Sequence, residues 1–188
     1  MKFSLKNLTK KIILITAFLL AGDMGLLAQE PSSRESQVKA VFLFNFTQFV
    51  DWPPKTFPEP DSPLIIGILG DDPFGSFLEQ ATTNEKINSH PLIIQHYKTV
   101  DEIKKCQILF INISNKDRLD LVFKALEGRS ILTVSDSRNF IRQGGMVRFF
   151  TENDKIKFQI NIEAAKAADL TISSKLLRLA EIVTSKNN

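Results

Sequence analysis

The stretch LIIGIL, residues 64–69, lies between Pro63 and Gly70 and is apolar at nearly every position. A continuous apolar run of this length is typical of a strand that is buried on both faces of a parallel sheet. Further strands are predicted at 92–97, 107–113 and 131–134, with helical segments between them. We therefore expect an α/β fold, a three-layer α/β/α sandwich with a mostly parallel sheet.

The last third of the chain predicts a late antiparallel hairpin and two closing helices. Residues 146–150 and 156–160 flank Glu152-Asn153-Asp154, which is typical of a hairpin turn. At the entry to this hairpin, Gly144 and Gly145 supply a positive φ or a close backbone approach, a structural role. Asn161 is placed to cap the first closing helix, which begins at about Ile162. The second closing helix is expected from Ser173, with these side chains inward: Ile172, Leu176, Leu179, Ala180 and Val183.

A long helix is predicted before the sheet. Ser32-x-x-Glu35 is a capping box, and Trp52 before Pro53-Pro54 ends the helix after about Val50. One stripe at helical spacing is expected to face the core: Val38, Val41, Phe42, Phe46 and Phe49. Asn45 lies within that stripe, so its amide should be hydrogen-bonded. Phe44 points roughly 100° away from it, so its ring either packs on a second apolar surface or contacts a partner.

The charge of the chain is concentrated at its beginning. Residues 1–28 hold four lysines and one aspartate, so the remaining 160 residues carry 20 basic and 20 acidic side chains. Because these 160 residues carry no net charge, nucleic-acid binding is disfavoured. The four lysines precede a largely apolar run of ten residues at 12–21 and then small residues, the order of a secretory signal peptide. We expect a signal peptide at 1–28, with an uncleaved anchor as the alternative, and a single exported domain at 29–188 without a later membrane span.

The glycine-bearing loop after residue 69 does not fit a phosphate site. Its spacing matches neither nucleotide-binding fingerprint, and Asp71 and Asp72 place carboxylates where a phosphate would bind. Asp72 is instead expected to cap a helix with Pro73 in its first turn. Gly70 and Pro73 are therefore predicted to be structural.

No catalytic or metal-binding constellation is apparent. His90 and His96 lack acidic or cysteine partners at a recognised ligand spacing, and Ser135-Asp136 has no histidine nearby in sequence. Cys106 is the only cysteine, so no intramolecular disulfide can form, and a buried thiol is expected. We predict a protein that is not an enzyme and has no cofactor. A hydrolase using carboxylates that spacing does not identify is the weakest alternative.

Taken together, the segments of this chain resemble the YfiR family of exported bacterial proteins. The motifs that carry the resemblance follow one another between Val38 and Val183: KAxFLxNFxxFVxWP at 39–53, GILGxDPFG at 67–75, CxILFI at 106–111, ILTVSD at 131–136, GGM at 144–146, FxINxxAA at 158–165 and LxISSxLLxLA at 170–180. Family members with redox-dependent stability carry cysteine pairs, which Cys106 alone cannot reproduce.

The resemblance implies a periplasmic α/β sandwich, often dimeric, without catalytic activity or cofactor. It also implies a repressor that binds the periplasmic sensor domain of an inner-membrane diguanylate cyclase, which lowers cyclic di-GMP and biofilm formation. Phe44, Ser173 and Ser174 are the candidate partner-binding residues, and Ser173-Ser174 also cap the last helix. The remaining motif residues are expected to be structural: Asn45, Trp52, Gly70, Pro73, Gly144, Gly145 and Asn161. The alternative is a periplasmic protein that binds a small molecule or an envelope component.

Overall fold

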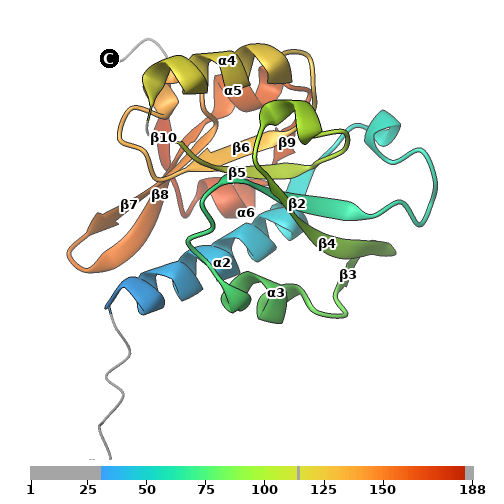
Figure 1. Ribbon diagram of the computed structural model, residues 1–188, viewed down its shortest axis with the longest axis horizontal. Helices are drawn as coiled ribbons and strands as arrows, with labels where there is room; N and C mark the ends of the chain where they lie inside the picture. Colours follow the sequence, from blue (N-terminus) through green and yellow to red (C-terminus); the bar gives the residue numbers. More distant parts are fainter. Residues whose placement is uncertain (1–30, 114, 185–188) are drawn as a thin grey trace, which may run out of the picture. The chain divides into compact units, whose positions relative to one another are not determined.

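The computed structural model describes residues 31–113 and 115–184 (Figure 1). The expected signal peptide at 1–28 and Ser114, the residue before the helix cap Asn115, lie outside these ranges. Of the helices in the described ranges, none is both long enough and apolar enough to cross a bilayer.

One mixed sheet forms the centre of the domain, with its strands in the order β10-β8-β7-β6-β5-β2-β4-β3. Neighbouring strands run parallel except for β3–β4 and the β7–β8 hairpin. The strands are β2 (Leu64–Gly70), β3 (Lys86–Ile87), β4 (His90–Tyr97), β5 (Ile108–Asn112), β6 (Leu132–Ser135), β7 (Val147–Glu152), β8 (Lys155–Asn161) and β10 (Glu181–Val183). A separate antiparallel pair joins β1 (Val50–Asp51) to β9 (Thr171–Ile172).

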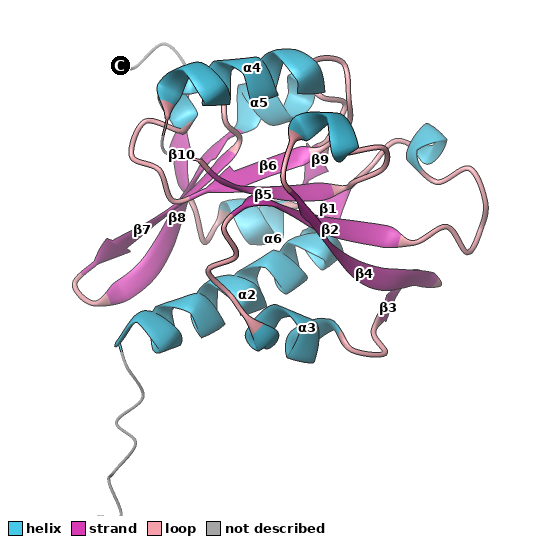
Figure 2. Ribbon diagram, viewed as in Figure 1, coloured by secondary structure: helices cyan, strands magenta, loops and turns pink. Residues whose placement is uncertain are grey.

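Helices lie on both faces of this sheet (Figure 2). One face carries α2 (Pro31–Phe49), α3 (Ser76–Thr82) and α6 (Ser174–Leu177), and the other carries α4 (Lys116–Leu126) and α5 (Ile162–Ala167). Short 3₁₀ turns complete the chain: η1 (Pro54–Thr56), η2 (Val100–Glu102) and η3 (Ile141–Gln143). The predicted α/β class, with its mostly parallel sheet and late antiparallel hairpin, is confirmed.

The strands divide their side chains between two hydrophobic clusters because successive residues point to opposite faces. On β5, Ile108 and Phe110 join the cluster under α2, whereas Leu109 and Ile111 join the cluster under α4. The rings of Phe149 and Phe158 lie 5.9 and 5.5 Å from the ring of Phe46, which anchors α2 to the hairpin strands.

Several residues that the sequence analysis expects to be structural make close contacts within the fold. The Asn161 carboxamide oxygen accepts a hydrogen bond from the Ala164 N–H at 3.1 Å and caps α5. Trp52 donates from Nε1 to the Gln107 carbonyl at 3.2 Å. A side chain at Gly145 would come within 2.2 Å of the Phe140 ring, and one at Gly70 within 2.4 Å of the Asn112 carbonyl oxygen. Gly144, at φ 102°, ends η3 in the left-handed conformation.

The predicted buried stripe of α2 is confirmed for Phe42, Phe46 and Phe49, which pack in the core, and is wrong for Val38 and Val41. Leu43 and Phe46 are fully buried, whereas Val41 is 51% exposed and Val38 37% exposed. The helix also contains Ser32 already, so the capping-box start is wrong, and Glu35 contacts Lys39 instead. Lys39 lies on the buried side because two carboxylates neutralise its charge, which allows α2 to turn Val41 outward.

Two other helix predictions are corrected. Asp72 does not cap α3: its Oδ1 accepts from the Phe74 N–H at 2.7 Å, and the positive φ of Gly75 separates this turn from the helix. The last helix is only one turn long, and Glu181–Val183 forms β10 instead, parallel to β8. The edge of β8 offers unpaired backbone groups to these residues, and Leu179 remains 69% exposed.

Candidate functional site

The outward side of α2 carries exposed apolar residues among polar ones: Val38 and Val41 are exposed together with Arg34 and Gln48. At 100° per residue, Val41 lies roughly opposite the buried residues Leu43 and Phe46. Val38 and Phe44 lie on either side of Val41, and both are partly or largely accessible. We call Val38, Val41 and Phe44 the α2 face.

A groove of about 540 Å³ adjoins the α2 face where the first half of α2 lies beside the β7–β8 hairpin (Figure 1). Its apolar residues are Val38 and Phe42 from α2 and Ile156 from β8. Its other lining residues are polar and carry both signs of charge: Arg34, Glu35, Thr151, Asp154 and Lys155. An apolar centre with a mixed polar rim is the composition of a protein-binding surface.

Lys39 holds this surface in position. Its ammonium donates to Asp136 at 2.8 Å and lies 2.6 Å from Glu35, and its side chain is only 8% exposed. Burial lowers the pKa of Lys39, but the hydrogen bonds and charges of Asp136 and Glu35 outweigh it, so the pKa is raised above its ordinary value. The pair ties α2 to the loop after β6 and thereby fixes which side of α2 faces outward.

The second pair of candidate partner-binding residues lies at the other end of α2. The Ser173 N–H donates to the Phe49 carbonyl at 2.9 Å, next to the β1–β9 pair. The Ser173 hydroxyl accepts from the Lys175 N–H and caps α6, as predicted, so this side chain serves the fold. Ser174 is exposed. The structure therefore brings Ser174 to the end of the helix that carries Phe44.

Phe44 and Asn45 do not have the contrasting environments that the sequence predicts. Both side chains are half-buried. Within the described ranges the Asn45 amide makes no hydrogen bond to backbone or to a buried polar group, so its predicted bonding is wrong. The rotation of α2 explains the difference, because Asn45 lies beside the outward Val41 instead of within the buried side.

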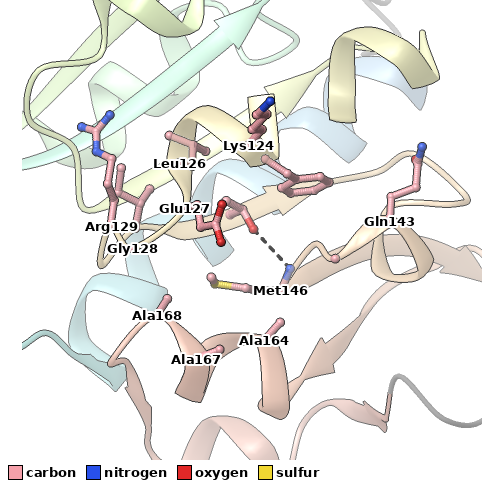
Figure 3. Close-up of a pocket in the computed structure, with 14 residues that line it drawn as sticks. Lys124, Leu126, Glu127, Gly128, Arg129, Gln143, Met146, Ala164, Ala167 and Ala168 are labelled. Atoms are coloured by element: carbon pink, nitrogen blue, oxygen red, sulfur yellow. Dashed lines mark hydrogen bonds between the residues drawn. The ribbon is translucent and has the colours of Figure 1, made fainter. Parts of the chain in front are cut away.

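A second groove, of about 390 Å³, lies between α4 and α5 (Figure 3). Its lining is largely apolar and includes Leu126, Met146, Ala164 and Ala168. The Met146 N–H in this groove donates to the Thr133 hydroxyl at 3.2 Å. Figure 3 shows Arg129 directed away from the alanines of α5, whereas the carboxylate of Glu127 lies at the groove. This is the place in the fold that suits a small apolar ligand.

Ser135 and Cys106 are both buried and make hydrogen bonds within the fold. The Ser135 hydroxyl is buried, donates to the Ile111 carbonyl at 2.7 Å and accepts from the Ser137 N–H. Burial raises the pKa of Cys106 to about 12, so its thiol is not activated. The predicted burial of Cys106 is confirmed.

The chain matches the sequence model of a protein family. The sequence model described as YfiR/HmsC-like covers residues 36–181, from the first turns of α2 to the start of β10. No curated protein matches the chain.

Proposed function

Because this chain belongs to the YfiR/HmsC-like family, we propose that it is a noncatalytic periplasmic regulator that represses an inner-membrane diguanylate cyclase. The family match over residues 36–181 carries this proposal. In this function the protein binds the periplasmic sensor domain of the cyclase and lowers cyclic di-GMP and biofilm formation.

In the proposed mechanism, binding shifts the cyclase from its active to its inactive conformation. Binding that favours the inactive conformation of the cyclase represses it, and the repression is limited by the difference in affinity for the two conformations. No chemical step by the regulator is needed. The regulator must only present a rigid surface that fits one conformation.

The α2 face and the adjoining groove are the proposed contact surface. The ion pairs of Lys39 and the ring contacts of Phe46 hold α2 rigidly on the sheet. The exposed apolar side chains of Val38 and Val41 supply area that can be desolvated in a complex. Phe44 and Ser174 extend this surface along α2 toward α6.

A photo-crosslinking experiment in cells tests the proposal. A photoreactive amino acid at Val41 should crosslink to a membrane protein with a diguanylate cyclase domain, which mass spectrometry identifies. Leu121, 65% exposed on α4 at the other face of the sheet, is the matched control position. Crosslinks to the cyclase from Leu121 but not from Val41 would place the contact surface on the α4 side instead.

The second candidate function is the binding of a small molecule or envelope component, and the groove between α4 and α5 favours it. A ligand at 100 times its dissociation constant should stabilise the protein by about 2.7 kcal/mol. A thermal-shift screen of periplasmic metabolites would detect this. Stabilisation that is lost on Ala168→Trp, which narrows the groove, would support this function. A homodimer through the α2 face would instead appear in sedimentation velocity and be lost on Val41→Asp.

A further inference from the structure

We propose that Asp72, Glu79 and His96 form a binding site for one zinc ion. The three side chains come from three different elements: the turn after β2, the helix α3 and the strand β4. Their ligand atoms, two carboxylate oxygens and one imidazole nitrogen, all lie within 4.8 Å of one another. The sequence spacing of these residues matches no metal motif, and only the fold brings them together.

The fold directs all three side chains to the same place. On β4, His96 follows Leu92 and Ile94 at two-residue spacing, so it lies on the face that α3 covers. Glu79 lies on α3, and Asp72 lies in the turn that leads from β2 to this helix. This is the carboxyl end of two parallel strands, where open α/β sheets bind ligands.

Two of the ligand atoms are already at a distance that suits a metal site. His96 Nε2 lies 3.0 Å from Asp72 Oδ2. A tetrahedral zinc ion with bonds of about 2.0–2.2 Å holds its ligand atoms about 3.3 Å apart, so small movements of these two groups admit the ion. The other carboxylate oxygen of Asp72 accepts from the Phe74 N–H at 2.7 Å, which orients the group.

The two carboxylates of Asp72 and Glu79 give the cluster a negative charge that favours the binding of a cation. In the described ranges, neither Asp72 nor Glu79 forms an ion pair with a lysine or arginine. Two carboxylates therefore lie within 4.8 Å of each other and of an imidazole nitrogen, without a lysine or arginine beside them. The nitrogen ligand distinguishes zinc from magnesium and calcium, which prefer oxygen ligands only. Water completes the coordination, since the cluster is open to solvent.

The test uses the two histidines of the chain as a matched pair. His90 bonds to the Ser62 carbonyl and stacks on Phe57, so it has no part in the cluster. The purified untagged protein is titrated with zinc chloride in a calorimeter, alongside His96→Gln, Glu79→Gln and His90→Gln. We expect one zinc ion per chain. Affinity should fall at least about tenfold in His96→Gln and in Glu79→Gln and remain unchanged in His90→Gln. An excess of magnesium should not compete.

A spectroscopic measurement on the wild-type protein tests the same site without relying on the folding of the His96→Gln and Glu79→Gln variants. Zinc should shift the ring-nitrogen NMR signals of His96 and leave those of His90 in place. The proposal is overturned by the absence of saturable one-to-one binding, by unchanged affinity in either ligand variant, or by a shift of the His90 ring alone. Because the proposal does not involve the α2 face, these outcomes are separate from those that test repression.

Discussion

The ammonium of Lys39 lies 2.8 Å from the carboxylate of Asp136, 97 residues further along the chain. This contact joins α2, at the beginning of the described domain, to the carboxyl end of β6 in the middle of the sheet. Because the carboxylates of Asp136 and Glu35 are each about 40% exposed, they remain solvated while the lysine is enclosed. The orientation of the α2 face depends on this enclosed charge.

Replacing Lys39 by Met should keep the packing of the aliphatic part of this side chain but remove the charge of its ammonium group. We expect the free energy of unfolding at pH 7 to fall by about 1–2 kcal/mol, since charge-assisted hydrogen bonds to partly solvated partners are lost. Urea unfolding measures it. Lys55→Met is the control: the Lys55–Asp169 pair, at 3.0 Å, is largely exposed and should contribute less than about 0.5 kcal/mol. Equal losses in the two variants would contradict the special role of Lys39.

The ion pair of Lys39 with Asp136 should also make the free energy of unfolding depend on pH. The folded-state pKa of Lys39 is raised above 10.5. The stabilisation is therefore complete below pH 10.5 and is lost as pH rises through the folded-state pKa. The stability difference between wild type and Lys39→Met should be constant from pH 7 to about 10 and shrink above it. Tyr97, whose pKa is raised to about 12, titrates in both proteins, so its effect on stability cancels in the difference. A difference that grows with pH would contradict this assignment.

The strands and turns of this fold could be predicted because their signals are local. The apolar run at 64–69 and the cap Asn161 depend on neighbours in sequence, and the Asn153-Asp154 turn places both residues at positive φ, as a tight hairpin requires. The rotation of α2 could not be predicted, because Leu43 and four phenylalanines give the helix apolar residues on several sides. Its buried side follows from the packing of Ala40, Leu43 and Phe46 on the sheet and from the ion pair between Lys39 and Asp136, which periodicity does not reveal.

The candidate sites were only partly predictable for the same reason. The sequence predicts that helix α2 carries more apolar residues than its core-facing side needs. It predicts Phe44 as the residue that points away from the core and does not predict the exposure of Val41. Asp72 and His96 are 24 residues apart and meet only because β2 and β4 are neighbours in the sheet. The strand β10 was missed because its pairing with β8 depends on an edge that exists only in the folded sheet.

Phe44→Ala should weaken binding to the cyclase domain more than it weakens the fold. Because the ring is half-buried, we expect a loss of about 1–2 kcal/mol in unfolding free energy. The comparison is Phe46→Ala, which removes a fully buried ring and should cost about 3–5 kcal/mol. Chemical denaturation and a binding assay measure both effects. A loss for Phe44→Ala as large as that for Phe46→Ala would make Phe44 a core residue.

Asn45→Leu should change stability by less than about 0.5 kcal/mol. The amide is half-buried, and no hydrogen bond to it is lost within the described ranges. The same denaturation series measures this. A loss above about 1 kcal/mol would contradict this and would mean that the Asn45 amide is hydrogen-bonded in the folded protein.

The thiol of Cys106 should be inert in the folded protein. Its Sγ lies 2.9 Å from the Ile108 carbonyl, and its pKa of about 12 keeps it protonated at neutral pH. A disulfide-exchange reagent should therefore react with less than one tenth of the chains in the time it needs for complete reaction in urea. Cys106→Ala should leave regulation unchanged. Rapid reaction of the folded protein would show an accessible thiolate and reopen redox control.

The central claim, repression through the α2 face, is tested most directly by cyclic di-GMP in cells that lack the gene. Deletion should raise cyclic di-GMP, and wild type and Leu121→Asp should return it to its original level. Val41→Asp, the same kind of apolar-to-acid change at a position of α2 that is 51% exposed, should accumulate normally and fail to lower cyclic di-GMP. An unchanged nucleotide level on deletion would contradict the proposed function, and full complementation by Val41→Asp would contradict the α2 face as its surface.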